Sequence, residues 1–471
     1  MQNFLKKLNG LKSCKETLTD VISRGSQSAH SEDKTILVSV SFSITDTIDP
    51  IDIFAMARGV ESERTFWAKP DQNMWLVGVG CAKELLSNSD DPITDINYEY
   101  NHLLESALIV RTGDFLKGPV FIGGTRFDTS IQQSNAWSGF HDARFVLPKF
   151  LFTFSNGETW VTVNLLTTHE TDPSKKAQTL ISEIEFLCQA ESVKYTQPLI
   201  VESNSGSYDE WKSWLEHALN SIDNGLLSKV VLARRKVLIG DGDFSAEAGL
   251  QNLVQDYPEC CVFAHATAGS CFIGATPEAL ISLKSGIVDI SCLAGTVKRG
   301  INSEEDELLA KALLVSDKER REHQVVVDML IEVLRENCKK LDWDLEPSVI
   351  KLRNVQHLRT SFTGRTKHNV GILDLVDMLH PTAALGGVPS NTALNIIRNL
   401  EGDRGWYAAP VGWIDDKGDG EFSVAIRSAL IRGNQATLFA GAGIIKGSDI
   451  RKEFQETDLK FQPLLSALGG R

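Results

Sequence analysis

The sequence predicts a protein that combines helices with mainly antiparallel strands. Short apolar or alternating runs, typical of strands, fill much of residues 35–200. Beyond residue 208 longer helical and strand patterns alternate. Several strand runs in this second half follow one another across Gly, Ser or Lys turns, which is typical of antiparallel meanders. We therefore expect both α and β structure, with strands paired to their neighbours in sequence.

The first half of the chain is expected to be rich in strands. Residues 1–34 are predicted to be a polar lead-in with one short helix, ending in a Gly/Ser-rich connector at 24–34. Residues 35–205 are predicted to contribute strands, with one helix at 98–112. The expected strands are ILVSVSF, MWLVGVG, FVLPKFLFTF and TWVTVNLLT.

The polar run ESNSGSY at 202–208 marks the predicted boundary with a second region, 206–471. Helices are expected there at 211–224, at 304–337 and from residue 449 onward. The expected strands are KVVLARRKVLI, CVFAHATAG, SCFIGATPEALISL, GIVDISCLAGTVKRG, WYAAPVGWID, EFSVAIRSALIR and ATLFAGAGII.

Composition excludes several classes of protein. The 471 residues are 42% hydrophobic and 23% charged, as in ordinary globular proteins, and suffice for two or three domains. A net charge of −14 disfavours binding to nucleic acid or to anionic membranes, so an anionic ligand needs local cations. We expect a cytosolic protein, because the sequence has neither an apolar run of about 18 residues nor a secretory signal. Its eight cysteines form no C-x-x-C pair and are expected to be reduced thiols.

Common catalytic motifs are absent from the sequence. It contains no phosphate-binding G-x-x-x-x-G-K-[ST], no dinucleotide-binding G-x-G-x-x-G after a strand, no H-E-x-x-H and no G-x-S-x-G. This removes the usual support for nucleotide binding, zinc proteolysis and serine hydrolysis.

Two carboxylate pairs remain as candidates for metal binding. Glu319 and Glu322, like Glu453 and Glu456, are three residues apart in predicted helices, so each pair shares one face. Two such faces that meet would offer oxygen ligands to magnesium. The same spacing is common on solvated helix faces. Lys460, four residues after Glu456, suits either a helix ion pair or a substrate contact.

Three further charged residues stand in unusual places. Lys229 begins an apolar strand and could act as a base if burial or a nearby cation favours its neutral form; the alternative is an edge-strand lysine that reaches water. Glu278 follows Thr-Pro, which also suits a helix entry. Arg427 lies in an apolar strand and needs an acceptor, either a protein carboxylate or a ligand anion.

The segments around these residues resemble the chorismate-utilising enzymes, in that family's order across 225–465. Within the family the chain is most similar to isochorismate synthases of the menaquinone-pathway type, while residues 1–205 match loosely. The matching segments are KVVLARR, FIGATPEAL, CLAGTVKRG, EHQVVVDML, VQHLRTSFTG, HPTAALGGVP, RGWYAAPVGW, FSVAIRSALI and LFAGAGIIKGSDIRKEFQET.

The resemblance implies an α+β fold with a large, mainly antiparallel two-sheet core and helices packed outside. It implies a magnesium-dependent isomerase that adds water at ring carbon two of chorismate and releases the hydroxyl at carbon four. Lys229 then matches the general base and Glu278 the general acid. The other matched positions are Glu322 and Glu456 as metal ligands, supported by Glu319 and Glu453; Arg427, Tyr407, Lys460 and the amides of Gly441 to Gly443 around the substrate carboxylates; and His357 and Thr296 beside the ring.

The resemblance also separates activities within the family. Ala294 stands where aminodeoxychorismate synthases often carry a nucleophilic lysine, which disfavours that activity. Ala384 replaces the usual threonine of anthranilate and salicylate synthases, and Leu385 follows as in isochorismate synthases. Salicylate synthases share the first step and then eliminate pyruvate, so that activity is the main alternative. A non-catalytic binding subunit is a second alternative, although the acid, base and metal positions are all present. No glutaminase partner is expected.

Overall fold

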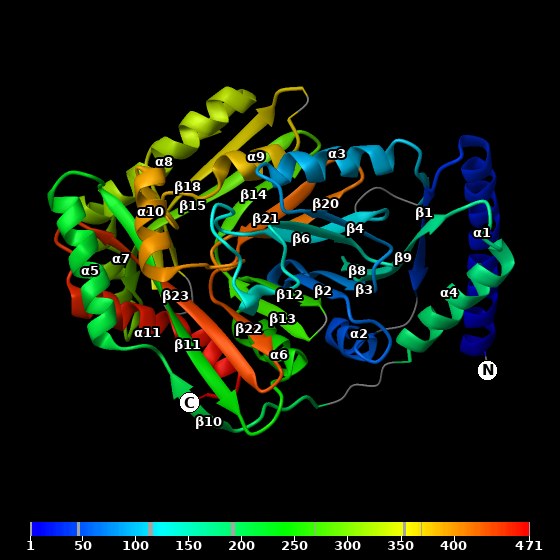
Figure 1. Ribbon diagram of the computed structural model, residues 1–471, viewed down its shortest axis with the longest axis horizontal. Coiled ribbons are helices and arrows are strands. Elements are labelled where there is room, and N and C mark those ends of the chain that lie inside the picture. Colours follow the sequence, from blue (N-terminus) through cyan, green and yellow to red (C-terminus); the bar gives the residue numbers. More distant parts are fainter. Residues whose placement is uncertain are drawn as a thin grey trace.

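The computed structural model describes residues 2–44, 48–111, 116–189, 194–267, 269–351, 355–368 and 370–470, with side chains from residue 14 onward. Within these ranges the strands form two large sheets, and helices cover their outer faces (Figure 1). The fold therefore has the α+β, mainly antiparallel two-sheet architecture expected from the family resemblance.

The larger sheet has 13 strands in the described part of the chain, and its pairing is antiparallel except between β1 and β5. The order is β10 (Ile200–Asn204), β11 (Lys229–Gly240), β23 (Gln435–Ile445), β22 (Ser428–Arg432), β13 (Ser270–Thr276), β12 (Cys261–Thr267), β2 (Arg64–Lys69), β3 (Met74–Val79), β8 (Phe150–Ser155), β9 (Glu158–Thr167), β1 (Ile36–Ile44) and β5 (Leu108–Val110), with β19 (Gly387–Val388) also paired to β11.

The smaller sheet has 10 described strands. Their order is β16 (Cys338–Trp343), β18 (Val355–Thr366), β15 (Ile287–Lys298), β14 (Ala279–Lys284), β21 (Gly420–Val424), β20 (Pro410–Asp415), β6 (Val120–Thr125), β7 (Ala143–Leu147) and β4 (Lys83–Ser87), with β17 (Ser348–Lys351) paired to β18. Strands that precede residue 205 therefore belong to both sheets.

The helices lie outside these sheets, with α3, α8 and α9 beside the smaller one (Figure 1). No described helix combines the length and the apolar character that a membrane crossing requires. The described α-helices are α1 (Gln2–Glu32), α2 (Pro50–Ala57), α3 (Pro92–Leu104), α4 (Pro173–Leu187), α5 (Tyr208–Asp223), α6 (Ala246–Asp256), α7 (Ser303–Val315), α8 (Asp317–Asn337), α9 (Ile372–Leu379), α10 (Ser390–Glu401) and α11 (Ile450–Ala467).

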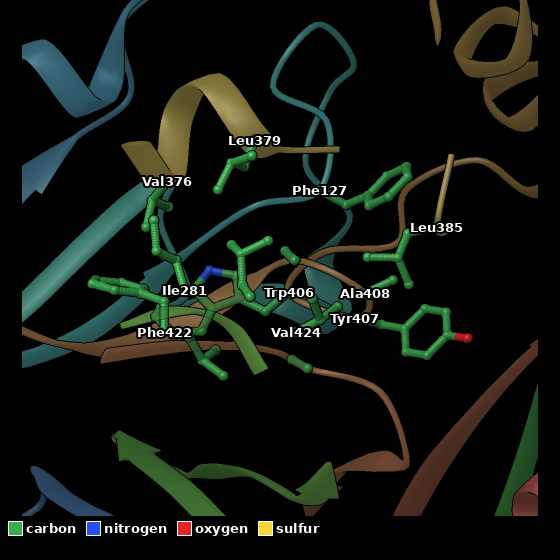
Figure 2. Packing of buried hydrophobic residues seen from close by; sticks show 14 of the residues in the cluster. Phe127, Ile281, Val376, Leu379, Leu385, Trp406, Tyr407, Ala408, Phe422 and Val424 are labelled. Atoms are coloured by element: carbon green, nitrogen blue, oxygen red, sulfur yellow. The ribbon is translucent and has the colours of Figure 1, made fainter. Parts of the chain in front are cut away.

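Buried apolar side chains form two clusters, and the first joins residues of both sheets. Figure 2 shows the part of it where Ile281 of β14, Phe422 of β21 and Val376 of α9 pack together. Each such side chain contributes about 1.5–3 kcal/mol when fully buried. Leu385 and Tyr407 lie at one end of this group, with the Tyr407 hydroxyl directed away from the labelled apolar side chains (Figure 2).

The chain passes from one sheet to the other at two places that matter for the site. The sequence predicts one strand in SCFIGATPEALISL and one in EFSVAIRSALIR, whereas each is two strands, one per sheet. Glu278 lies between β13 and β14, and Arg427, with a φ of 48°, lies between β21 and β22. The crossings are joined because Ala275 N–H donates to Arg427 O and Val424 N–H donates to Glu278 O.

Three predicted helices also differ from the structure. The helix expected at 304–337 is divided at Ser316, whose extended backbone (ψ 112°) ends α7 and whose hydroxyl caps α8. The helix expected at 98–112 begins and ends earlier, at Pro92 and Leu104, and Thr112 lies outside the described residues.

The helix expected to be short near the N-terminus instead extends to Glu32 and includes residues 24–32 of the predicted connector. Its residues Leu18, Val21 and Ile22 are buried. Gly25 permits close packing, since a Cβ there would lie 2.6 Å from Cγ2 of Val38. Packing against the sheet therefore stabilises a helical conformation in this polar segment.

Candidate active site

Lys229 is held in the interior of the larger sheet. It pairs with Ile445 of β23 on one side and Val388 of β19 on the other, and only 5% of it is exposed. The alternative of an edge-strand lysine in contact with water is therefore wrong. Its Nζ donates a hydrogen bond to Oε1 of Glu322 on α8 over 2.8 Å. Gly443 leaves room for this pair, because a Cβ there would lie 3.2 Å from Cε of Lys229.

Glu278 occupies the crossing from β13 to β14, so the alternative of a helix entry is also wrong. Burial raises the pKa of its carboxyl to about 7, although Lys229, Lys460 and Arg427 each act to lower it. These three cations lie close enough to influence Glu278, which places residues from four distant segments in one neighbourhood. A carboxyl with this pKa is partly protonated near neutral pH and can donate a proton.

Arg427 occupies the other crossing and is a cation available to a ligand. Its guanidinium forms no ion pair or side-chain hydrogen bond with the residues that the structure describes, and burial lowers its pKa. Tyr407 lies nearby, with its ring stacked on Phe439 at a centroid distance of 5.1 Å. Burial raises the pKa of Tyr407 to about 12, so its hydroxyl remains a donor. A Cβ on Gly441 would lie 3.0 Å from that hydroxyl.

Lys460 extends from α11 to the end of β23. Its Nζ donates to the carbonyl oxygen of Gly441 over 2.8 Å and lies 2.6 Å from Oε1 of Glu456. The interpretation of Lys460 as part of a helix ion pair is therefore confirmed, and its contact with a substrate stays a prediction.

His357 and Thr296 are cross-strand neighbours in β18 and β15. Nδ1 of His357 lies 2.9 Å from Oγ1 of Thr296. Burial lowers the pKa of His357 to about 4, and the positive charges of Arg427 and Lys460 act in the same direction. The imidazole is therefore neutral at physiological pH and acts as a hydrogen-bonding group.

The four candidate metal ligands lie on α8 and α11. Oε2 of Glu319 accepts a hydrogen bond from the amide of Thr296 over 2.9 Å. Burial raises the pKa of Glu453 to about 7, and the negative charge of Glu456 raises it further. Burial opposes ionisation of Glu322 as well, but the positive charges of Lys229, Lys318 and Lys460 together outweigh burial and lower the pKa of Glu322.

These carboxylates fit magnesium in chemistry and in neighbourhood. Lys318 influences the charge of both Glu322 on α8 and Glu453 on α11, so the two helices bring acidic groups to one region. In the described part of the chain, however, no three His, Cys, Asp or Glu side chains converge at a spacing that would hold a metal ion. To bind an ion here, Glu322 and Glu456 would exchange their present lysine partners for it.

Buried polar groups that no sequence motif marks also lie next to these site residues. His323, next to Glu322, is 2% exposed and bonds through its two ring nitrogens to Ala294 O and Thr360 Oγ1. Arg404 and Glu401 form a buried ion pair near β11. Their residue type is a local feature that could have identified them, because a buried charged or imidazole side chain needs a hydrogen-bonding partner.

The model of the family described as "Chorismate binding enzyme" matches residues 24–469. The chain belongs to this family. An isochorismate synthase MenF of Bacillus subtilis is 34% identical over 443 residues, which cover 92% of this chain and 94% of that protein. A salicylate biosynthesis isochorismate synthase of Pseudomonas aeruginosa is 33% identical over 480 residues, which cover 99% and 98% of the two chains.

Solved structures of chorismate-binding enzymes share the fold. One is described as MenF, the menaquinone-specific isochorismate synthase from Escherichia coli, with a TM-score of 0.77, 25% identity and coverage of 92% of this chain and 94% of that one. The anthranilate synthase component I of Streptococcus pneumoniae has a TM-score of 0.71 at 21% identity, a similarity of fold alone, over 83% and 92% of the two chains. The predictions of family and fold class are thus confirmed.

Proposed function

We propose that this chain is an isochorismate synthase, an isomerase that converts chorismate to isochorismate with magnesium. The observation that carries the proposal is Glu278, whose carboxyl has a pKa of about 7 in a neighbourhood that also contains Lys229 and Arg427. Exchange of one ring hydroxyl for another needs both a proton acceptor and a proton donor. Relatives that span nearly the whole chain carry the name isochorismate synthase.

Lys229 and Glu278 divide the proton transfers in this proposal. Water attacks ring carbon two, and Lys229 in its neutral amine form takes the proton of that water. The hydroxyl at carbon four leaves as water with a proton from Glu278, and the ring double bonds shift. One water enters and one leaves, so the substrate and product are isomers. Each group supplies about 100-fold or more of the rate, as is usual for a positioned acid or base.

The cations and donors around Glu278 bind the two carboxylates of chorismate. Arg427 has the free, planar guanidinium that suits two-pronged carboxylate recognition. The Tyr407 hydroxyl, Lys460 and the amides of Gly441 and Gly443 add donors.

The ring has a separate set of neighbours in this proposal. Neutral His357 and Thr296 lie beside the ring, joined by their 2.9 Å contact.

In this proposal Glu322 and Glu456 would hold magnesium, and Glu319 and Glu453 would support them. When bound, the ion neutralises the carboxylate on the substrate ring. The raised pKa of Glu453 supports this assignment. The negative charge of Glu456 contributes to that rise, and a cation bound between the two carboxylates would offset it.

The nucleophile is water in this proposal. Ala294 is buried and offers no amine, while Ala384 and the buried Leu385 occupy the segment that precedes β19. We place the product in menaquinone synthesis, as in the name of the E. coli structure. We also propose a cytosolic location, where the eight free cysteines stay reduced, and no glutaminase partner.

The proposal is tested with purified protein, chorismate and magnesium, by following isochorismate, salicylate and pyruvate separately. Isochorismate alone is expected. Equal amounts of salicylate and pyruvate would instead identify a salicylate synthase, and no conversion would favour a binding subunit.

A further inference from the structure

Glu401 and Arg404 form a buried ion pair next to the candidate site. Their side chains are 4% and 2% exposed, respectively. Nε of Arg404 donates to Oε2 of Glu401 over 2.8 Å, and Nη2 donates to Oε1 over 2.6 Å. The pair is thus a two-pronged contact in which the carboxylate and the guanidinium fix each other's orientation.

This pair also binds the backbone of two segments of the site. Nη2 of Arg404 donates to the carbonyl oxygen of Val231 over 2.7 Å, and Nη1 donates to that of Leu385 over 3.0 Å. Oε1 of Glu401 accepts from the amide of Ala233 over 2.8 Å. The two side chains therefore connect β11 with the segment that carries Leu385.

The connected backbone lies directly beside Lys229. Ser228 N–H donates to Val388 O over 2.7 Å, and Val231 N–H donates to Gly386 O over 2.9 Å. Lys229 lies between these two bonds and pairs with Val388. Residues 385–388 thus form one wall along the start of β11, and Arg404 holds that wall and the strand together.

Arg404 itself is not in contact with the reacting groups. Its guanidinium lies 4.4 Å from the ring centre of Phe127 and 6.0 Å from that of Tyr407. Its hydrogen bonds to the carbonyl oxygens of Val231 and Leu385 connect it to the site through the backbone.

We propose that Glu401 and Arg404 are positioning residues that fix the start of β11, which carries Lys229, against residues 385–388. The proposal rests on the proposed function for its kinetic consequence, since Lys229 is the proposed base. A shift of about 1 Å in a catalytic group costs about 100-fold in rate. Lysine cannot replace this arginine, because a single ammonium cannot reach two carbonyls and both carboxylate oxygens in one plane.

The test compares Arg404→Lys with a matched control, Arg64→Lys. Arg64 is also a buried arginine, 8% exposed in its side chain, and it binds Glu247 and the carbonyl of Phe54, away from β11. Both variants are expected to melt at a lower temperature. Below the melting transition, Arg404→Lys should lose about 10- to 100-fold in kcat with a nearly unchanged KM for chorismate, while Arg64→Lys keeps wild-type kcat.

Hydrogen exchange gives a readout that is independent of turnover. Arg404→Lys should speed amide exchange in peptides that cover 228–233 and 385–388, and Arg64→Lys should not. If the wild-type protein fails to convert chorismate but this local exchange appears, the proposed function is wrong and the positioning role stands. A folded Arg404→Lys protein with wild-type kcat or unchanged local exchange overturns the proposal. Should Arg404→Lys not fold, Glu401→Gln provides the same two measurements with the same expectations.

Discussion

Nζ of Lys229 lies 2.8 Å from Oε1 of Glu322, so the proposed base is bound to a proposed magnesium ligand. The two residues are 93 positions apart in sequence, and a tertiary contact joins Glu322 of α8 to Lys229 at the start of β11. In this arrangement the carboxylate neutralises the ammonium. A divalent cation held by Glu322 would compete with Lys229 for this oxygen.

Replacing Lys229 should therefore separate metal binding from turnover. Lys229→Ala is expected to lose about 100-fold or more in kcat, because the proton acceptor is gone. It should bind magnesium at least as tightly as the wild type, because the competing ammonium is gone. Calorimetric titration and steady-state kinetics measure the two effects. Lys236→Ala on the same strand is the control. Near-normal turnover by Lys229→Ala would defeat the assigned role.

The metal assignment predicts loss of magnesium dependence when either ligand loses its charge. Glu322→Gln and Glu456→Gln should abolish magnesium-dependent turnover and keep a wild-type circular dichroism spectrum, because a neutral amide is a weaker ligand for a hard cation. Glu332→Gln, on the exposed face of α8, should change nothing. Wild-type turnover at limiting magnesium by a folded Glu456→Gln protein contradicts the assignment.

Arg427 should control affinity for the substrate. Arg427→Lys is expected to raise the KM for chorismate about 10-fold or more, because a point charge cannot reproduce a two-pronged carboxylate contact. The control is Arg432→Lys, an exposed arginine bound to the carbonyl of Asn135. Unchanged KM in a folded Arg427→Lys protein excludes the guanidinium as a carboxylate ligand.

The pKa of Glu278 predicts the alkaline side of the pH profile. Below pH 7 its carboxyl is protonated and can donate; above pH 7 it ionises, so kcat/KM should fall as the pH rises through about 7. Saturating magnesium removes the separate influence of protons on the metal ligands. Glu278→Gln should be slower by about 100-fold or more and lack this limb. A wild-type profile that is flat from pH 6 to 9 is incompatible with Glu278 as the acid.

Local sequence patterns predicted the elements that are long and periodic. The helix expected at 211–224 matches α5, and the one expected from residue 449 matches α11, whose first turn is capped by Asp449. The sequence pattern did not predict the crossings at Glu278 and Arg427, because each residue lies in an apolar run whose pattern indicates a single strand. Only the partner strands in two different sheets decide where such a run divides.

The candidate site residues follow from the family resemblance, whereas their contacts with one another do not. Family resemblance named Lys229, Glu278 and Arg427, and the structure gives Glu278 the raised pKa that an acid needs. The ion pair between Lys229 and Glu322 and the hydrogen bond from Arg404 to Val231 depend on tertiary contacts. No spacing along the chain encodes those contacts.

The source of the new ring hydroxyl tests the account most directly. The purified chain is incubated with chorismate and magnesium in water enriched in oxygen-18, and the product is analysed by mass spectrometry at early times. Attack by solvent water would give isochorismate with one heavy oxygen, located on ring carbon two. Isochorismate without the label, which means transfer of the original hydroxyl, or release of salicylate with pyruvate in its place, would contradict it.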